Sequence, residues 1–530
     1  MKAKKYCLIA AVLLVAAACD MKINPEGGTI TGEQKDQLAA AEPGKMQSEI
    51  NGLYAKLIQV GSISAWAGSD RHYDFGYPAA CMMFDASGMD APSENSGYNW
   101  FLPQQQYTDR AANSANSYFL WNLFYSHAKG ANDIIRVIDP DTDDPTLRAY
   151  LGQALAARAF DYEHLVQIYQ FTGKGRENDL AIPIVTERTP ADSINNNPRA
   201  TVASVHQFII DDLTRAISLL TDFDRRGRKE CINRQVAYGL RARANLLAER
   251  WDSAAADARR AIAGNTPYTI AEVSKPAFNN IAADAWIWGC AITENNDAVL
   301  TGIINFPAHM CSLTGNGYSP GFAGRYINKN LWEQIPDDDV RKGWWTDTTL
   351  LSPHLDATWT ITYNGEKYNL VDWFQFQAPY LNVKFGPYQD IYNNPTNACD
   401  FPLMRVEEMI LLRAEALAMS GNTTEASQIL TDFITAYRQP SYTTAATTPE
   451  DLRDEIWFQR RVELWGEGFS LFDLKRLKKP LLRANANYPG NVSFDLPAEA
   501  PILLWLIPES EINANRGIQE NNPVVPVPHP

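Results

Sequence analysis

Apolar residues recur at helical spacing over much of the chain. In the segment from 146 to 170, Leu147, Leu151, Ala154 and Leu155 fall on one face of a helix. The segments with this pattern are 45–60, 112–138, 146–170, 202–221, 233–263, 405–437 and 450–478. The pattern predicts a mainly α fold.

Two of these segments repeat a spacing of small residues. Ala242 and Ala254 are twelve positions apart in the first, and Ala414 and Ala426 are twelve apart in the second. Ala258 and Ala261 continue the small face of the first. Small residues on both sides of a short turn let two antiparallel helices approach closely, which resembles the tetratricopeptide helix pair. Two unrelated alanine-rich helices would give the same pattern.

The composition changes between about 266 and 400, where Gly, Pro, Asn and aromatic residues dominate and there is no long helical pattern. The run TWTITYNGEKYNLV at 358–371 is typical of a β-hairpin. We therefore predict a tetratricopeptide-like helical-repeat scaffold, at 45–265 and 401–530, with a loop-rich ligand platform containing short hairpins at 266–400.

The N-terminus has the features of an export signal. Three lysines precede a short apolar run at 8–18 that ends in small residues before Cys19. This run is too short to span a bilayer comfortably, so we predict a lipoprotein signal peptide at 1–18 and lipidation of Cys19. Residues 19–44 are polar and are predicted to form a flexible tether. The alternative is a signal peptide that is cleaved without lipidation.

Composition limits the classes of partner. The 530-residue chain has a net charge of −15, so we expect no nucleic-acid binding. A polyanionic ligand is also disfavoured, unless a local basic pocket overrides the overall charge. Five cysteines follow Cys19 without a CxxC pair, which favours buried thiols over a zinc site or a disulfide framework. They are Cys81, Cys231, Cys290, Cys311 and Cys399.

Two short motifs resemble functional sites but lack essential parts. GYSPG at 317–321 matches a nucleophile elbow, yet Pro320 removes the backbone N–H that would complete the oxyanion hole. DPDTDDP at 139–145 has Asp144 where a calcium loop needs glycine, and Tyr150 where it needs glutamate. We expect no metal, no cofactor and no enzymatic activity, although a pair of glycosidase carboxylates stays open because sequence does not give their separation.

Aromatic residues cluster in segments predicted to be loops. Indole and phenol rings can stack on a sugar while nearby polar side chains bind its hydroxyl groups. The alternative is that these rings fasten the insertion to the scaffold. The candidate glycan-binding residues are Asp70, Arg71, Tyr73, Tyr98, Asn99, Trp100, Trp286, Trp288, Tyr318 and Trp345.

The densest mixture of charge and aromatics is RRVELWGEGFSLFDLKR at 460–476. Two glycines interrupt the helical pattern, and the segment has no His, Cys or Tyr to serve as a nucleophile or tunable base. Spacing predicts that Arg460 pairs with Glu463, and that Arg461 or Arg476 pairs with Glu467 or Asp473. Such arginine–carboxylate pairs would fix the orientation of two helices on either side of the glycines, so we interpret the segment as structural.

These residues resemble the C-terminal signature of the SusD/RagB family of outer-membrane nutrient-binding lipoproteins. The matching positions are Arg460, Arg461, Glu463, Leu464, Glu467, Gly468, Asp473, Leu474 and Arg476. The chain has Gln459 and Ser470 where the family pattern has glutamate and arginine. DFPLMRVEEMILLRAEALAMSG at 400–421 and WLIPESEINANRGIQENNP at 505–523 are also similar to family segments.

The resemblance implies a binding protein anchored by lipid on the outer membrane and facing the exterior. It implies capture of an oligosaccharide, or of a peptide in some members, for a TonB-dependent SusC-like transporter. No binding residue carries over, because the family has no shared ligand motif. A protein-interaction scaffold without a small ligand remains an alternative, and it predicts no exposed aromatic cluster within 266–400.

Overall fold

The computed structural model describes residues 46–63, 71–319, 321–355 and 378–529, together with the strands at 360–363 and 366–369. Cys19, the signal and tether segments, and Asp70 lie outside the described residues. In the described part, no helix is both long enough and apolar enough to cross a membrane.

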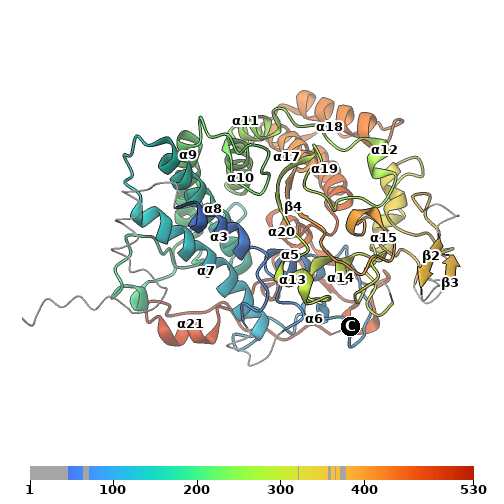
Figure 1. Cartoon of the computed structure of the whole chain (residues 1–530), viewed down its shortest axis with the longest axis horizontal. Coiled ribbons are helices and arrows are strands. Elements are labelled where there is room, and N and C mark those ends of the chain that lie inside the picture. The colour runs from blue at the N-terminus through green and yellow to red at the C-terminus, as the bar shows by residue number, and fades with distance from the viewer. Residues whose placement is uncertain are drawn as a thin grey trace, which may run out of the picture.

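The structure confirms the mainly α fold (Figure 1). The two long segments at 233–263 and 405–437 each form two helices joined by a short turn. The scaffold helices are α3 (Gln47–Lys56), α7 (Ala115–Val137), α8 (Pro145–Tyr169), α9 (Val202–Leu219), α10 (Arg234–Leu247), α11 (Trp251–Ile262), α17 (Val406–Met419), α18 (Thr423–Tyr437), α19 (Pro449–Glu463) and α20 (Ser470–Arg476).

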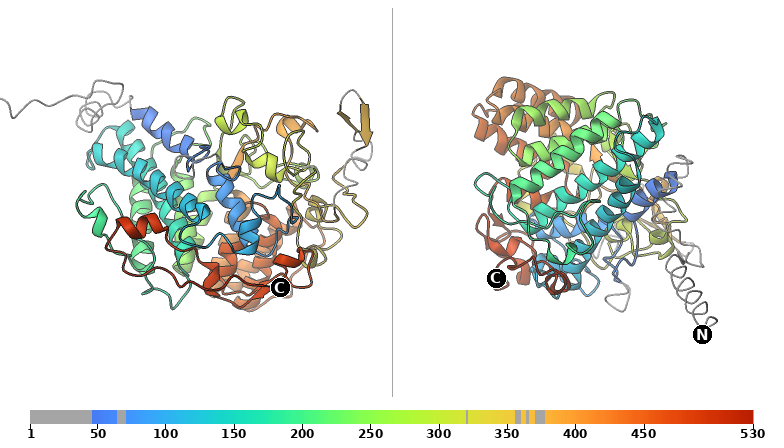
Figure 2. Two further views of the ribbon diagram at one scale, coloured as in Figure 1. Left: turned by 90° about the horizontal axis from the view of Figure 1, so that it is seen from below. Right: turned by 90° about the vertical axis from the view of Figure 1, so that its left-hand side faces the viewer.

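Neighbouring scaffold helices pack in a continuous row, from α7 through α8, α9, α10 and α11 to α17, against which both α18 and α19 pack. Figures 1 and 2 show this row running from one end of the molecule toward the other. Ala242, Ala254, Ala258, Ala414 and Ala426 are fully buried, as the close approach of paired helices requires. The α10–α11 and α17–α18 pairs confirm the tetratricopeptide-like repeat, and α11 against α17 stacks one pair on the other.

Polar side chains begin several of these helices. Asp144 accepts hydrogen bonds from the backbone N–H groups of Thr146 and Leu147 (2.8 and 2.9 Å), and Pro145 occupies the first turn of α8. An N-cap of this kind satisfies N–H groups that lack a partner within the helix. The acidic run at 139–145 is therefore the loop that ends α7 and starts α8.

One buried helix has no counterpart among the predicted segments. Every residue of α5 (Tyr77–Ser87) is buried, and α5 packs against α20. A helix that is apolar on all sides has no amphipathic period, so the pattern gave no signal for it. The aromatic segment predicted as a loop at 69–78 therefore runs into the first turn of a core helix.

The middle of the chain is held by short elements. The strands β2 (Thr360–Tyr363) and β3 (Glu366–Asn369) pair antiparallel, which confirms the predicted hairpin; Figures 1 and 2 show them at the end of the molecule away from α7–α9. The remaining elements, in this region and elsewhere in the chain, are α6 (Leu102–Gln106), η3 (Ile194–Asn196), α12 (Ile270–Val273), β1 (Trp286–Cys290), α13 (Asp297–Leu300), α14 (Phe306–Met310), α15 (Lys329–Trp332), η4 (Val340–Trp344), η6 (Tyr388–Asp390), β4 (Phe401–Arg405), β5 (Leu481–Leu482), η7 (Gly490–Val492), β6 (Asp495–Leu496), η8 (Pro501–Leu503) and α21 (Glu509–Ala514).

The strand β1 pairs with β4 in the interior, which fastens the start of the loop-rich region to the start of α17. Trp286 and Trp288 in β1 are 0% and 1% exposed. Trp345 is 1% exposed and lies edge-on against Trp465, with ring centroids 5.5 Å apart. These three candidate glycan-binding rings are therefore not available to a ligand, because the region folds back and buries them as core; they fit the alternative, in which the rings fasten the insertion to the scaffold.

The segment at 460–476 forms a corner between α19 and α20, with Gly466 and Gly468 in the left-handed backbone region (φ 81° and 91°). A Cβ on Gly468 would lie 2.8 Å from Cys81 in α5, so only glycine fits there. Its backbone N–H donates to the Asp85 carboxylate (2.8 Å). The helix α5, from the N-terminal part of the chain, therefore packs against and hydrogen-bonds to the corner between α19 and α20.

The ion pairs at this corner match those that spacing predicted only in part. Arg476 binds Asp473 (2.8 Å), as predicted, but Arg460 reaches past Glu463 to Asp473 (2.7 Å). Arg461 binds Asp90 from the N-terminal half (2.6 Å). Spacing along one helix cannot reveal a partner that is close only in space.

Glu463 and Glu467 belong to a buried ionic network. Arg438 donates to Glu463 (2.7 Å), Arg405 bridges Glu463 (3.2 Å) and Glu467 (2.8 Å), and Lys384 donates to Glu467 (2.7 Å). These side chains have little or no exposure, which leaves no room for a substrate. The structural interpretation of the segment fits this burial. The five cysteines of the described part are likewise buried and unpaired.

Candidate functional site

Three loops bring aromatic side chains together at the surface. They are the loop at 71–76 before α5, the loop at 92–101 before α6, and the loop at 315–326 after α14. Figure 1 places these three helices side by side in the lower middle of the molecule. We call the resulting cluster the aromatic platform; it consists of His72, Tyr98, Trp100, Tyr318 and Phe322.

The platform has an exposed edge and a partly covered interior. Tyr98 and Phe322 are 53% and 55% exposed, and their ring centroids are 5.0 Å apart. Tyr318 follows at 6.1 Å from Tyr98, and His72 at 5.8 Å from Tyr318. Trp100 is half-buried and stacks on His72 at 4.5 Å. The rings therefore form a continuous apolar surface open on one side.

Backbone contacts hold the second and third loops next to each other. The Ser93 hydroxyl donates to the Gly324 carbonyl (2.9 Å), and the Ser96 hydroxyl donates to the Phe322 carbonyl (2.7 Å). The Tyr326 N–H donates to the Pro92 carbonyl (3.0 Å). Because these hydrogen bonds fix the backbone of both loops, Tyr98 and Phe322 are held in position before any ligand arrives.

A buried histidine supports the platform from below. His309 stacks on Tyr318, with centroids 4.8 Å apart, and its Nε2 lies 3.0 Å from the His72 carbonyl. Burial holds the pKa of His309 well below its usual value, so the ring is neutral at pH 7. The hydroxyl of Tyr318 also forms a hydrogen bond with Nδ1 of His72.

A glycine permits this arrangement. A Cβ on Gly317 would lie 2.5 Å from the backbone of Ala308, and the N–H of Tyr318 donates to the Ala308 carbonyl (2.6 Å). Ser319, the serine of the GYSPG motif, is fully buried and its hydroxyl lies 3.3 Å from that of Ser312. Within this motif Gly317 and Ser319 therefore help to position Tyr318, and Pro320 lies outside the described residues.

The predicted site residues separate into two groups. Tyr98, Trp100 and Tyr318 lie in the platform, although Tyr318 is only 8% exposed. Tyr73 is buried against Phe119, with centroids 6.3 Å apart, so the expectation that it is available to a ligand is wrong.

Two polar candidates have structural contacts. Asn99 is buried, and its side chain bonds to the Glu94 carbonyl (2.9 Å) and the Phe101 N–H (3.2 Å), which makes it a turn residue. Arg71 is half-buried, and its carbonyl accepts from the Asp74 N–H (2.9 Å). The expectation that Asn99 bonds to a sugar is wrong for this reason.

His72 and Phe322 belong to the platform but were not among the predicted residues. Both lie in aromatic-rich segments of the sequence, at 69–78 and 316–326. Composition could have indicated them, but their contacts with Trp100 and Tyr98 depend on how three loops meet.

The platform offers stacking surfaces and hydrogen-bonding groups, without an arrangement for covalent chemistry. Four of its five rings belong to Tyr, Trp or Phe, and the exposed side chain of Asn95 lies in the same loop as Tyr98. Within the described residues, no group of three His, Cys, Asp or Glu side chains could hold a metal ion. The surface is suited to a neutral ligand with apolar faces and hydroxyl edges.

Comparison with known proteins supports the family assignment, because family models match an N-terminal and a C-terminal segment of the chain. A model described as the SusD family matches residues 355–524, and a model described as starch-binding associating with outer membrane matches residues 44–246. A curated relative, SusD-like protein P38 of Formosa agariphila, is 25% identical over 390 residues, which is 69% of this chain and 73% of that protein.

Solved structures share the fold over nearly the whole length. A SusD-like carbohydrate binding protein from Bacteroides vulgatus superposes with a TM-score of 0.73 at 24% identity, covering 91% of this chain and 98% of that one. A laminarin binding SusD-like protein superposes with a TM-score of 0.64 at 16% identity, covering 91% and 99%. Together with the two matched segments and the C-terminal corner, these findings show that the chain belongs to the SusD/RagB family.

Proposed function

We propose that this protein is a surface-exposed lipoprotein that binds an oligosaccharide or polysaccharide on the aromatic platform and delivers it to a TonB-dependent SusC-like transporter. The observation that carries the proposal is the pair of exposed rings, Tyr98 and Phe322, continuous with Tyr318, His72 and Trp100. The family membership and the carbohydrate-binding relative support it.

Physical chemistry favours a neutral glycan on this surface. A pyranose ring presents C–H groups on its faces, which pack on an aromatic ring, and hydroxyl groups at its edge. Each stacking contact contributes on the order of 1 kcal/mol, so useful affinity needs several rings in contact at once. The platform provides rings at spacings of 4.5 to 6.1 Å, which suits an extended chain better than a single sugar.

An assembly role without a ligand is a weaker explanation of the same features. That alternative predicts no exposed aromatic cluster between 266 and 400, yet Phe322 is 55% exposed and contacts Tyr98. Contiguous exposed apolar patches are typical of binding sites, whereas single exposed rings are ordinary.

Titration calorimetry against neutral polysaccharides, including starch and laminarin, tests the proposal. We expect Tyr98→Ala and Phe322→Ala each to weaken binding on the order of tenfold, because each removes one stacking surface. The matched control is Leu482→Ala, since Leu482 is equally exposed at 51% but lies outside the platform. Binding of peptides in place of glycans, or equal loss in the control, would contradict the glycan assignment.

The anchor is a separate part of the proposal. Lipidation of Cys19 would tether the binding surface to the outer membrane, because acyl chains bury their methylene groups in the bilayer. We expect the Cys19→Ala variant to lose incorporation of labelled fatty acid and to leave the membrane fraction, while purified protein keeps its glycan affinity. A variant that stays lipidated and membrane-bound would show that Cys19 is not the acceptor.

A further inference from the structure

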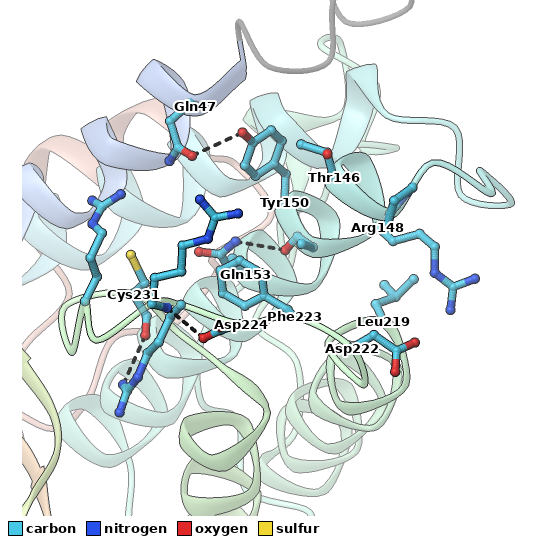
Figure 3. A pocket seen from close by; sticks show the side chains of 15 residues that line it. Gln47, Thr146, Arg148, Tyr150, Gln153, Leu219, Asp222, Phe223, Asp224 and Cys231 are labelled. Atoms are coloured by element: carbon cyan, nitrogen blue, oxygen red, sulfur yellow. Dashed lines mark hydrogen bonds between the residues drawn. The ribbon is translucent and has the colours of Figure 1, made fainter.

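A second cleft is lined by scaffold residues, and none of them belongs to the aromatic platform. It has a volume of about 630 Å³ and lies between α3, the start of α8, and the loop at 220–233 that joins α9 to α10 (Figure 3). Cavities of this size commonly hold small ligands. None of the predicted glycan-binding residues lines it.

The loop places three guanidinium groups at the cleft, in a protein whose net charge is −15. They belong to Arg225, Arg226 and Arg228. Arg228 is neutralised by Glu230, at 2.7 Å. In the part of the chain that the structure describes, neither Arg225 nor Arg226 forms an ion pair with a carboxylate. Two cations therefore remain for a ligand to neutralise.

Arg225 is half-buried and held by neutral partners. Its Nη1 donates to the carbonyls of Ile287 (2.8 Å) and Cys231 (3.4 Å). These bonds fix the guanidinium without cancelling its charge, and burial lowers the pKa of Arg225. A fixed cation with incomplete solvation is better prepared to bind an anion than a freely moving one.

Arg226 is exposed and is positioned by the backbone. Its φ is 50° and that of Gly227 is 80°, so two successive residues occupy the left-handed region. The N–H of Arg226 donates to Asp224 (2.8 Å), and the N–H of Arg228 donates to the Arg225 carbonyl (3.0 Å). These hydrogen bonds fix the backbone from which the Arg226 side chain projects.

The rest of the cleft is aromatic and amide-lined. The Tyr150 hydroxyl donates to Gln47 (3.2 Å), Gln153 donates to the Ala149 carbonyl (3.1 Å), and Phe223 is half-buried. Figure 3 shows Tyr150, Gln153 and Phe223 in the middle of the cleft, with Cys231 toward one end. A ligand would find an apolar face and amide groups beside the charged end.

A fourth arginine, Arg148, makes a natural comparison. Figure 3 shows it beside Asp222, at the end of the cleft away from Cys231. It also lacks an ion-pair partner within the described residues, but the nearby carboxylate opposes an anion there. Asp222 and Asp224 add negative charge to the cleft, which disfavours a polyanionic ligand.

We propose that this cleft binds a small ligand bearing a single oxyanion group, at the end formed by Arg225 and Arg226, with its apolar part against Tyr150 and Phe223. Guanidinium groups match the geometry of sulfate, phosphate and carboxylate oxygens through paired N–H donors. The site is distinct from the aromatic platform, so the proposal does not depend on the proposed glycan binding there.

Calorimetry with sodium sulfate, glucose 6-sulfate, glucuronic acid and glucose, at ionic strength matched with sodium chloride, tests the site and separates the possible ligands. We expect glucose 6-sulfate or glucuronic acid to bind at least tenfold more tightly than glucose, and sulfate to compete. If sulfate alone binds as tightly as the anionic sugars, the oxyanion site is supported and the sugar contributes nothing.

The decisive variant is Arg226→Gln, because Arg226 is exposed and its side chain supports no other contact in the described structure. We expect it to weaken oxyanion binding tenfold or more, whereas Arg148→Gln, which removes the same charge at the other end, leaves binding unchanged. Tyr98→Ala should have no effect on this site. The proposal is overturned if the wild-type protein binds none of the three anions, or if both arginine variants lose binding equally.

Discussion

At the centre of the C-terminal region, the Glu463 carboxylate is fully buried between arginines from three other segments. Arg438 donates to it at 2.7 Å, Arg405 lies at 3.2 Å and Arg341 at 3.6 Å. Burial alone would raise the pKa of Glu463, but these arginines hold it below its usual value. The ionised form is therefore part of the fold rather than a reactive group.

We expect Glu463→Gln to lower the free energy of unfolding by about 3 kcal/mol, because removing one member of a buried ionic group leaves the others uncompensated. Urea unfolding followed by circular dichroism would measure the loss. Glu333→Gln is the control, since its pair with Lys329 is long (3.6 Å) and half-exposed and should change stability very little. Equal effects of the two substitutions would contradict this role for the network.

The two departures from the family signature both take part in hydrogen bonds at the corner. Gln459 is buried and accepts a hydrogen bond from Arg341. The Ser470 hydroxyl donates to Asp90 (3.2 Å), which Arg461 also binds. Ser470 thus takes a small part in anchoring Asp90, and Arg461 supplies the charge. The sequence showed the departures, but only the fold shows which groups replace the missing ones.

At the scale of elements, close packing of small residues sets the spacing of the repeat. Ala254 and Ala258 of α11 are fully buried, and α11 packs against both α10 and α17. The sequence predicted this pair of helices because two alanines twelve positions apart recur in both halves. Local spacing was sufficient here, since each pair folds from contiguous residues.

We expect Ala258→Leu to destabilise the protein by about 2 kcal/mol, because the added atoms must displace well-packed neighbours. Ala256→Leu makes the same change on a half-buried face of the same helix and should have a much smaller effect. Thermal unfolding of both variants distinguishes them. If Ala258→Leu is no less stable than Ala256→Leu, then α11 does not approach its neighbours closely.

Elements were mispredicted where burial was complete. The helix α5 and the strand β1 are covered on all sides, so neither shows the period of a half-exposed element. Tryptophans in β1 were interpreted as ligand contacts because their composition resembles that of a binding loop. Composition gives the chemistry of a ring but not its exposure.

At the scale of the whole molecule, the N-terminal and C-terminal regions are joined through two carboxylates. Asp85, in α5, accepts from the N–H groups of Gly468 (2.8 Å) and Ser470 (3.2 Å). Asp90 binds Arg461 at 2.6 Å. Burial raises the pKa of Asp85 to about 7, although the two N–H donors oppose that shift.

This shift makes stability depend on pH. An aspartate in an unfolded chain has a pKa of about 3.9, so the folded protein binds the Asp85 proton more tightly. The stabilising contribution of Asp85 is therefore complete below about pH 4 and is lost as pH rises through about 7. We expect Asp85→Asn to gain a few kcal/mol relative to the wild-type protein between pH 4 and pH 8.

Urea unfolding of both proteins at several pH values would measure this change. Asp337→Asn serves as the control, because the Asp337 side chain is 95% exposed and its difference from the wild-type protein should stay constant. A constant difference for Asp85→Asn as well would show that Asp85 titrates normally in the folded state.

The sequence by itself determined the helical scaffold, the repeat pairs, the hairpin and the family, because these depend on local spacing and on contiguous motifs. Tertiary structure alone decided that Arg460 pairs with Asp473 across the glycine corner, and that Arg461 and Glu463 pair with Asp90 and Arg438 from other segments. It also decided which aromatic rings reach solvent, since exposure depends on how separate loops meet. The platform and the arginine cleft therefore appear only after the chain has folded.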